Sequence, residues 1–279
     1  MIVAIVLTAV MIGLMAEIDP RVGYRGKDKS VEESAEAYGS LDAVLSTFVN
    51  GNGRVDYEAL RENPGELTRF IEFLKSASPE NRPDLFETEN DRKAYWINAY
   101  NALVIKEVVD HPGISSVKEV GWGLGVFWRK TFVVGGRRMN LNHIEHRILR
   151  KRFRDPRIHF VINCASESCP PLGNRIVTGD GLDEELHRKA AAFIQDSNHV
   201  RIDHGRKEIR LSRIFRWYRK DFTAAGESLQ AYVLRYLPRL TRDEKESIAT
   251  EYRIRFSRFG WELNSQDPPQ GRDGMDESF

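Results

Sequence analysis

The feature that most constrains this chain is the stretch from Asp155 to Leu172, DPRIHFVINCASESCPPL. Its first half has the alternating side-chain period of a β-strand, with Ile158, Phe160 and Ile162 on one face and His159, Val161 and Asn163 on the other. Cys164, a run of small polar residues and Cys169 follow, and these are the only two cysteines in the chain. The sequence therefore predicts a strand that delivers two thiols into a tight loop, which is typical of a functional site.

Composition bounds the class of protein. The 279 residues are enough for one large domain, and 41% hydrophobic with 30% charged residues describe an ordinary globular chain. The 42 basic and 41 acidic residues nearly cancel, which removes the electrostatic case for a dedicated nucleic-acid binder. Two cysteines are too few for a disulfide framework or for a complete thiolate zinc site.

The N-terminus begins with an apolar run, MIVAIVLTAVMIGLMA, over residues 1–16. The run is shorter than the roughly 20 residues that a membrane-spanning helix needs, and it has the length of a signal-peptide core. It therefore predicts an exported protein, in the periplasm or secreted. The alternatives are an uncleaved membrane anchor and a buried helix, and membrane attachment is expected only through this segment.

The rest of the chain reads as one domain. Residues 17–39 are charged and contain glycine, which predicts a linker, and residues 265–279 are rich in Pro, Gly and Asp, which predicts a disordered tail. Residues 40–264 contain helical and strand-like segments without an internal repeat. They predict an α+β domain in which helices pack against a small, mostly antiparallel sheet.

The strongest helix is predicted over residues 89–109, where apolar residues recur at three- and four-residue spacing. Asn98 and Asn101 lie on or beside this apolar stripe. A buried asparagine needs partners for its amide, so each must have a purpose there. Either they hold a neighbouring loop, or one of them orients a catalytic imidazole or contributes to an oxyanion site.

Other segments are predicted as follows. An amphipathic helix is expected over 66–77, and hairpins are expected around Gly135-Gly136 and around His204-Gly205. Asn142 is expected to cap a helix that carries Glu145 and His146. The aromatic residues of 214–222 are expected to be core, and Arg253 to Phe259 is expected to be a final strand.

Four motifs occur in one order, and together they resemble the DUF547 family: AYWINAYNALVI at 94–105, FVVGGRRMNLNHIEHRILR at 132–150, DPRIHFVINCASESCPPL at 155–172 and LSRIFRWYRKDF at 211–222. The resemblance covers roughly residues 40–240. It implies an α+β domain with a papain- or transglutaminase-like core, a cysteine-centred site that contains His and Glu, and frequent export. The motifs select the following residues in this chain: Asn98, Asn101, Glu145, His146, His159, Asn163, Cys164 and Cys169.

Cysteine catalysis needs a thiolate, and a nearby imidazole lowers a thiol pKa that starts near 8.5. Cys169 is the better candidate, because its loop of small residues can expose it, whereas Cys164 would share the strand face of the apolar residues. His159 is the first candidate base and His146 the second. Glu145 is expected to orient His159 rather than its own neighbour. This arrangement predicts acyl hydrolysis or transfer on a peptide-like amide, without a cofactor.

Two alternatives stay open at this point. Cys164 and Cys169 could pair as a disulfide, which would make the domain an exported binding or scaffold module or gate the site by redox state. A second alternative is a metal site made from both cysteines together with His146 and His159, although their spacing is looser than in typical zinc sites. Asn98, Asn101 and Asn163 are assigned to substrate binding. The resemblance implies a small peptide-like or thiol-containing ligand.

Overall fold

The computed structural model describes residues 29–121 and 123–266. The predicted export segment 1–16, the first part of the predicted linker, and all but two residues of the predicted tail lie outside these ranges. None of the helices within them is long and apolar enough to cross a membrane.

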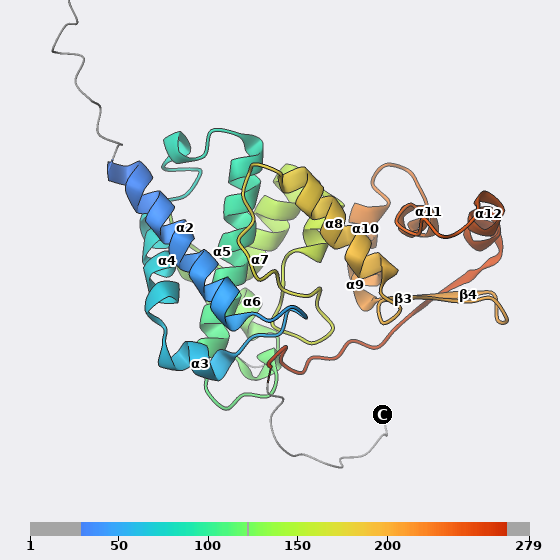
Figure 1. Cartoon of the computed structure of the whole chain (residues 1–279), viewed down its shortest axis with the longest axis horizontal. Coiled ribbons are helices and arrows are strands. Elements are labelled where there is room, and N and C mark those ends of the chain that lie inside the picture. Colours follow the sequence, from blue (N-terminus) through green and yellow to red (C-terminus); the bar gives the residue numbers. More distant parts are fainter. Residues whose placement is uncertain (1–28, 122, 267–279) are drawn as a thin grey trace, which may run out of the picture.

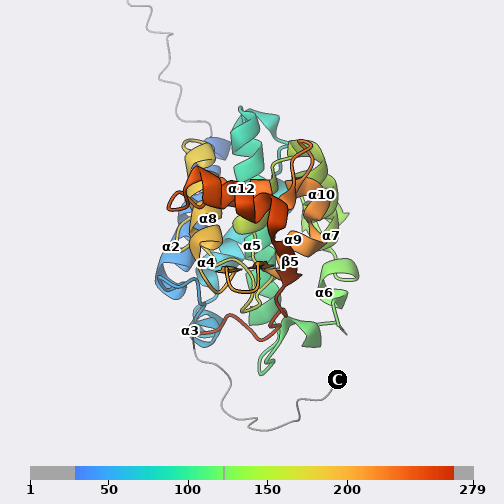
Figure 2. The same ribbon diagram turned by 90° about the vertical axis from the view of Figure 1, so that its right-hand side faces the viewer.

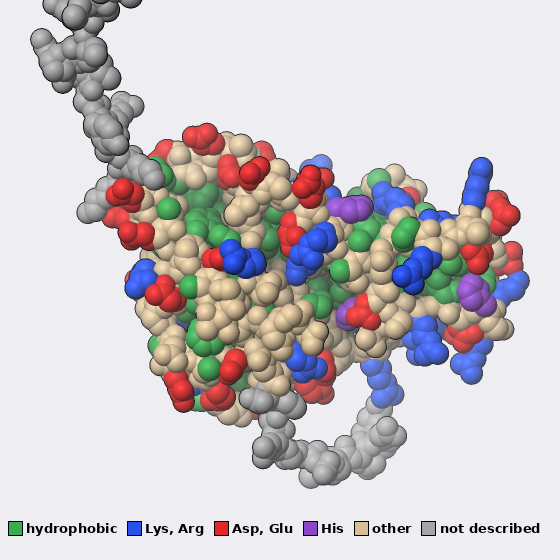
Figure 3. Space-filling view, viewed as in Figure 1, with side chains coloured by type: hydrophobic (Ala, Val, Ile, Leu, Met, Phe, Trp, Pro, Cys, Tyr) green, Lys and Arg blue, Asp and Glu red, His purple; other side chains and the backbone are tan. Residues whose placement is uncertain are grey.

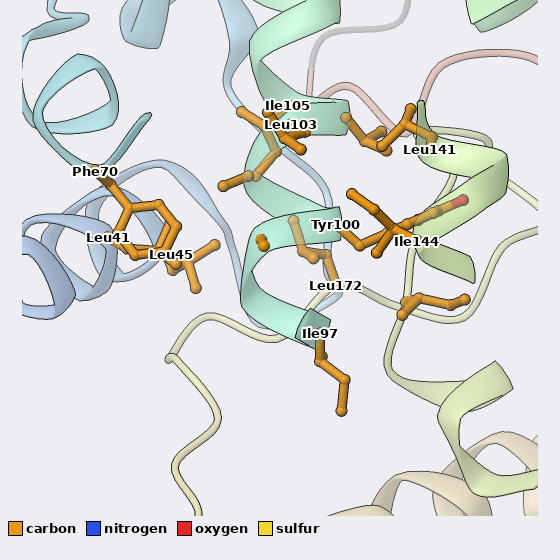
Figure 4. Packing of buried hydrophobic residues seen from close by; sticks show 14 of the residues in the cluster. Leu41, Leu45, Phe70, Ile97, Tyr100, Leu103, Ile105, Leu141, Ile144 and Leu172 are labelled. Atoms are coloured by element: carbon orange, nitrogen blue, oxygen red, sulfur yellow. The ribbon is translucent and has the colours of Figure 1, made fainter. Parts of the chain in front are cut away.

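Helix α5 (Glu89–Val109) forms the centre of the molecule and has the bounds that the sequence predicts. A capping box at Thr88 and Asp91 begins it. Every residue from Ala94 to Val109 except Lys106 is buried, as is typical of a helix that is surrounded by other elements. Figure 4 shows Leu41, Leu45 and Phe70 on one side of this helix, and Leu141 and Ile144 on the other.

Three helices cover one side of α5: α2 (Lys29–Phe48), α3 (Tyr57–Glu62) and α4 (Gly65–Ser76) (Figure 1). Helix α4 confirms the amphipathic helix predicted over 66–77, and it buries Leu67, Phe70, Ile71 and Leu74. Helix α2 begins at Lys29, whereas residues 17–39 were expected to be a linker. The linker prediction is therefore wrong for residues 29–39, where buried Ala37 already packs in the core.

The middle of the chain holds short elements that lead to the site. They are η1 (Pro83–Leu85), η2 (Val117–Glu119), α6 (Gly125–Trp128), β1 (Phe132–Val134), β2 (Arg137–Met139), α7 (Leu141–His143) and the π-helix η3 (Ile144–Phe153). Strands β1 and β2 pair antiparallel around Gly135-Gly136, which confirms that hairpin. The cap of the following helix is Asn140, whose Oδ1 accepts from the backbone N–H of His143, and not Asn142 as expected.

The strand predicted over residues 157–163 is wrong. Residues Pro156–Phe160 form a 3₁₀ helix, η4, and a turn follows it. Asp155 begins this helix by accepting a hydrogen bond from the backbone N–H of Arg157, and Pro156 supplies the fixed φ that suits a first helical position. Side chains on both halves of the apparent alternation are buried, so the pattern reflects a buried segment and not a two-faced strand.

The C-terminal part packs around a second hydrophobic cluster, which includes Phe160 from η4. Its elements are α8 (Leu182–Gln195), β3 (Val200–Asp203), β4 (Glu208–Leu211), α9 (Arg213–Trp217), α10 (Arg219–Phe222), α11 (Leu229–Leu234), α12 (Arg242–Glu251) and β5 (Arg253–Phe256). The hairpin β3–β4 is antiparallel, as predicted, and β5 adds to β4 in parallel. Figure 2 shows α6, α7, α9 and α10 along one side of the molecule.

The predicted α+β class is confirmed. Within the described residues, helices pack against two small sheets, in which two of the three strand pairings are antiparallel. The papain- or transglutaminase-like core stays a prediction. Both acidic and basic side chains are present on the face that Figure 3 shows, in line with the balanced composition.

Candidate functional site

A cavity of about 400 Å³ gathers side chains from α5, α6, η3, η4, α9 and the loops that follow η4 and β5. All five residues predicted to be catalytic line this cavity: Glu145, His146, His159, Cys164 and Cys169. Segments that are far apart in the sequence therefore meet at one place, as the sequence reasoning requires.

The two cysteines form a disulfide. The expectation that Cys169 is exposed is wrong, because its exposed fraction is 8%. The sequence left open a reactive thiol, a disulfide and a metal site for this pair, and the structure contains the disulfide. In this state neither sulfur is a nucleophile, since only the thiolate attacks.

The loop between the cysteines is held in an unusual backbone conformation. Ala165 has a φ of 61°, in the left-handed region that non-glycine residues rarely adopt. The backbone N–H of Ala165 donates to Asn163 Oδ1 at 2.6 Å, and the Asn163 amide donates to the Pro170 carbonyl at 2.8 Å. Asn163 thus bridges the two ends of the cysteine loop.

The chain after β5 fastens the same loop from outside. The backbone N–H groups of Glu167 and Asn264 bond to the carbonyls of Glu262 and Ala165, and the backbone N–H of Gly260 donates to the Ser168 hydroxyl. Gly53 lies against Pro171 with a φ of 73°, and a Cβ there would come within 2.7 Å of Pro171. The cysteine loop is therefore enclosed by two segments about 200 residues apart in the sequence.

The ring of His159 is fixed on two sides. Its Nε2 lies 2.7 Å from Asp221 Oδ2, and its face stacks on Tyr218 with ring centroids 3.8 Å apart. Its Nδ1 is buried and has no hydrogen-bond partner among the described residues. The partner predicted for His159 was Glu145, and that prediction is wrong, because Asp221 from α10 takes this place.

Burial sets the charge of this pair. It lowers the pKa of His159, and the hydrogen bond to Asp221 opposes that effect only in part. Burial alone would raise the pKa of Asp221, but hydrogen bonds from His159 and Arg150 outweigh it and hold that pKa well below its ordinary value. At neutral pH the imidazole is therefore neutral, and since Nε2–H donates to the carboxylate, Nδ1 carries the lone pair.

The carboxylate of Glu145 is held by two tyrosines. Tyr218 donates to Oε1 at 2.6 Å and Tyr100 donates to Oε2 at 3.0 Å. Burial raises the pKa of both phenols well above the ordinary value and the nearby Glu145 adds to the effect, so both hydroxyls stay protonated. Glu145 is thereby positioned through Tyr218, which also stacks on His159.

Arg150 connects the remaining polar groups of the cavity. Its Nε and Nη2 donate to the two oxygens of Asp221 at 2.6 and 2.9 Å, and its Nη1 donates to His146 Nδ1 at 2.6 Å. His146 also lies 3.8 Å from Glu145 Oε1. Both predicted imidazoles are thus linked to one network, and of the two, only His159 has a buried nitrogen without a hydrogen-bond partner among the described residues.

The three asparagines predicted to bind substrate do not line this cavity. Asn98 exchanges two hydrogen bonds with the backbone of Val177, and Asn101 bonds to the Val161 carbonyl and the Asn163 backbone N–H. Asn98 and Asn101 therefore hold neighbouring loops, which is the first of the two interpretations that the sequence left open.

The metal interpretation finds no support in the geometry. Within residues 29–121 and 123–266, no group of three or more His, Cys, Asp or Glu side chains is arranged to hold a metal ion. Both sulfurs of the proposed ligand set are used in the disulfide.

Residues 85–194 match the family model described as "Protein of unknown function, DUF547". This segment is similar to the DUF547 family. The searches of curated proteins and of solved structures gave no match. The matched segment contains Glu145, His146, His159 and both cysteines, whereas Tyr218 and Asp221 lie beyond its end.

Sequence reasoning missed Asp221, Arg150 and the pair of tyrosines that hold Glu145. Asp221 and Tyr218 belong to the motif at 211–222, which was quoted for the resemblance, but its aromatic residues were expected to be core. Ile214, Phe215 and Phe222 are indeed buried. Tyr218 and Trp217 line the cavity, together with the buried Ile214. The signal that could have found Asp221 is its place at the end of that motif.

The neutral, buried His159 predicts a pH dependence of stability. An unfolded histidine has a pKa near 6.5, so below about pH 6.5 the unfolded chain binds a proton that folded His159 resists. The stability that neutral His159 contributes to the fold is therefore complete above about pH 6.5, and it is lost as the pH falls. We expect His159→Gln to lose less unfolding free energy than the wild type between pH 7 and pH 5 in urea titrations. Superimposable pH profiles would contradict this assignment.

His199 also has a pKa lowered by burial, so the wild-type profile alone does not isolate His159. For that reason the measured quantity is the difference between the wild type and the variant at each pH.

Proposed function

We propose that this protein is a cysteine-dependent acyl hydrolase or transferase that acts on a peptide-like amide after its disulfide is reduced. The observation that carries the proposal is the state of His159. One ring nitrogen is held by a carboxylate, and the other has no hydrogen-bond partner in the part of the chain that the structure describes. The ring lines the same cavity as both sulfurs. An oriented histidine in the same cavity as a thiol is the kind of base that nucleophilic catalysis by cysteine uses.

The first step of the proposal is reduction. A dithiol gives two electrons and two protons to the Cys164–Cys169 bond and itself becomes a disulfide, which leaves two thiols at the cavity wall. Cys169 is the proposed nucleophile because its Sγ already accepts the backbone N–H of Cys164 at 3.1 Å. A hydrogen bond to the sulfur favours the charged thiolate.

In the second step His159 Nδ1 takes the thiol proton and Cys169 Sγ attacks the amide carbonyl carbon. The carbon–nitrogen bond breaks, the amine leaves with the proton from His159, and a thioester remains on Cys169. Water then hydrolyses the thioester to the free acid, or an acceptor amine takes the acyl group. In both cases the thiol is regenerated.

A second candidate function is an exported binding module whose disulfide is structural. The bond observed between the cysteines favours it, because such bonds persist in oxidising compartments outside the cytosol. Export itself is predicted from residues 1–16, and it makes both candidates periplasmic or secreted proteins. A small peptide-like or thiol-containing molecule is the proposed ligand in either case.

Thiol alkylation separates the two candidates. The protein is reduced with a phosphine and treated with iodoacetamide between pH 5 and pH 9, and the labelling of Cys169 is followed by mass spectrometry of its peptide. We expect an apparent pKa well below the ordinary value of about 8.5, because His159 accepts the proton. In His159→Gln it should return to about 8.5.

The matched control is His204→Gln, which changes an exposed histidine in the β3–β4 turn, and it should leave the alkylation profile unchanged. An ordinary thiol pKa in the reduced wild type would reject the catalytic proposal. The second candidate, an exported binding module, would then be favoured.

A further inference from the structure

We infer that the substrate of this cavity carries an aromatic or other flat apolar group next to its amide carbonyl, an inference that rests on the proposed function. Its first support is where the fold exposes large apolar side chains. Within residues 29–121 and 123–266 the exposed ones are Val31 at 47%, Leu124 at 39%, Trp128 at 58% and Trp217 at 45%. All of these except Val31 line the cavity. Clustered exposure of this kind marks a binding site.

One part of the lining is a group of three packed rings. Trp217 lies 4.8 Å from Phe259 and 5.8 Å from Trp261 between ring centroids, and Phe259 lies 4.7 Å from Trp261. The ammonium of Lys118 lies 4.7 Å from the centroid of Trp261 and covers that ring. Because these rings are already packed together, a ligand that stacks on Trp217 orders few further side chains, and this favours binding.

A second part of the lining comes from helix α6. Trp128 lies 6.2 Å from the ring of His146, which in turn is linked through Arg150 to the Asp221–His159 pair. The apolar surface therefore continues to the polar groups of the proposed chemistry. A substrate group that stacks on the tryptophans places the neighbouring carbonyl toward those polar groups.

The size of the cavity identifies the kind of occupant. About 400 Å³ lies in the range of small-molecule sites. Aromatic rings prefer offset-stacked or edge-to-face contact with other aromatic rings. A small amide with an aromatic acyl group satisfies both conditions.

The test uses the full chain in its oxidised form, which binds without reacting. Isothermal titration calorimetry compares N-benzoylglycinamide with N-acetylglycinamide. We expect the benzoyl compound to bind about tenfold or more tightly than the acetyl compound, and Trp217→Ala and Trp128→Ala each to weaken benzoyl binding by about tenfold. Val31→Ala, which removes an exposed apolar side chain outside the cavity, should leave the affinity unchanged.

Equal affinity for the two amides, or benzoyl binding that neither tryptophan variant weakens, would overturn the inference. The two variants lie in different segments, so if thermal unfolding shows that one is misfolded, the other decides. The oxidised protein has no thiol, so the result does not depend on Cys169. A reactive thiol without benzoyl preference rejects this inference alone, whereas benzoyl preference with an ordinary thiol pKa rejects only the proposed catalysis.

Discussion

Asp221→Asn is expected to slow iodoacetamide labelling of reduced Cys169 about tenfold or more at pH 6.5. The carboxylate of Asp221 accepts from His159 Nε2 and from two nitrogens of Arg150. An uncharged amide removes the ion pair and no longer stabilises the imidazolium that forms when Nδ1 takes the thiol proton. The thiol pKa should therefore rise toward its ordinary value, and the loss in labelling rate should shrink at high pH.

The pH profile distinguishes this role from general damage to the fold, since damage would change the labelling rate at every pH. The control is Asp183→Asn, which weakens an exposed ion pair with Arg157 and should leave the profile as in the wild type. A profile for Asp221→Asn that equals the wild-type profile would show that His159 does not act through this carboxylate.

Asn101→Ala is expected to lower the free energy of unfolding by about 2–4 kcal/mol, because it leaves two buried backbone groups without partners. The Asn101 side chain donates to the Val161 carbonyl and accepts from the Asn163 backbone N–H. The residues that it holds lie between His159 and Cys164, so the same change should loosen the cysteine loop. Urea unfolding measures the first effect, and hydrogen exchange at the Asn163 amide measures the second.

The control for this prediction is Asn63→Ala at the end of α3. Asn63 is exposed and its amide donates to the Ala59 carbonyl of its own helix, so its loss should change stability by no more than about 0.5 kcal/mol. If both variants lower the free energy of unfolding by the same amount, the two buried hydrogen bonds of Asn101 contribute little to stability. The interpretation of Asn101 as a residue that holds the neighbouring loop would then fail.

The helices and hairpins that the sequence predicts well have local signals. Helix α5 has a capping box at Thr88 and a long apolar pattern, and both its bounds are predicted. The hairpin at Gly135-Gly136 has two glycines with positive φ, which the turn needs. In such segments the residues that decide the structure are neighbours in the sequence.

Residues 157–163 show where this reasoning fails. Alternation predicts a strand only if one face is buried and the other is not, but Ile158 and His159 are equally buried here. Because both faces are covered, the two-residue alternation of apolar side chains does not distinguish a strand from a helix. The local signal that favours the 3₁₀ helix is the Asp155 cap followed by Pro156. Both residues open the motif at 155–172, and a cap followed by proline is the signal of a helix start.

The residues that line the candidate site could be predicted, but the hydrogen bonds that join them could not. Five side chains selected from the motifs line one cavity. Glu145 was expected to orient His159, yet its two oxygens are taken by Tyr100 and Tyr218. The partner of His159 lies 62 residues away in a separate helix. Such a pairing depends on how α10 packs against η4, and no local pattern encodes it.

The segment after β5 shows that the folded domain extends well beyond the residues that match the family model. The DUF547 match ends at residue 194, but the strip from Gly260 to Asn264 pins the cysteine loop, and Phe259 and Trp261 complete the cavity lining. A fragment cut to the matched residues would keep the disulfide and His159, and would lack the carboxylate and the aromatic rings that complete their surroundings. The smallest unit worth expressing therefore extends to Gln266, whose backbone still bonds to Val55 near the start of the fold.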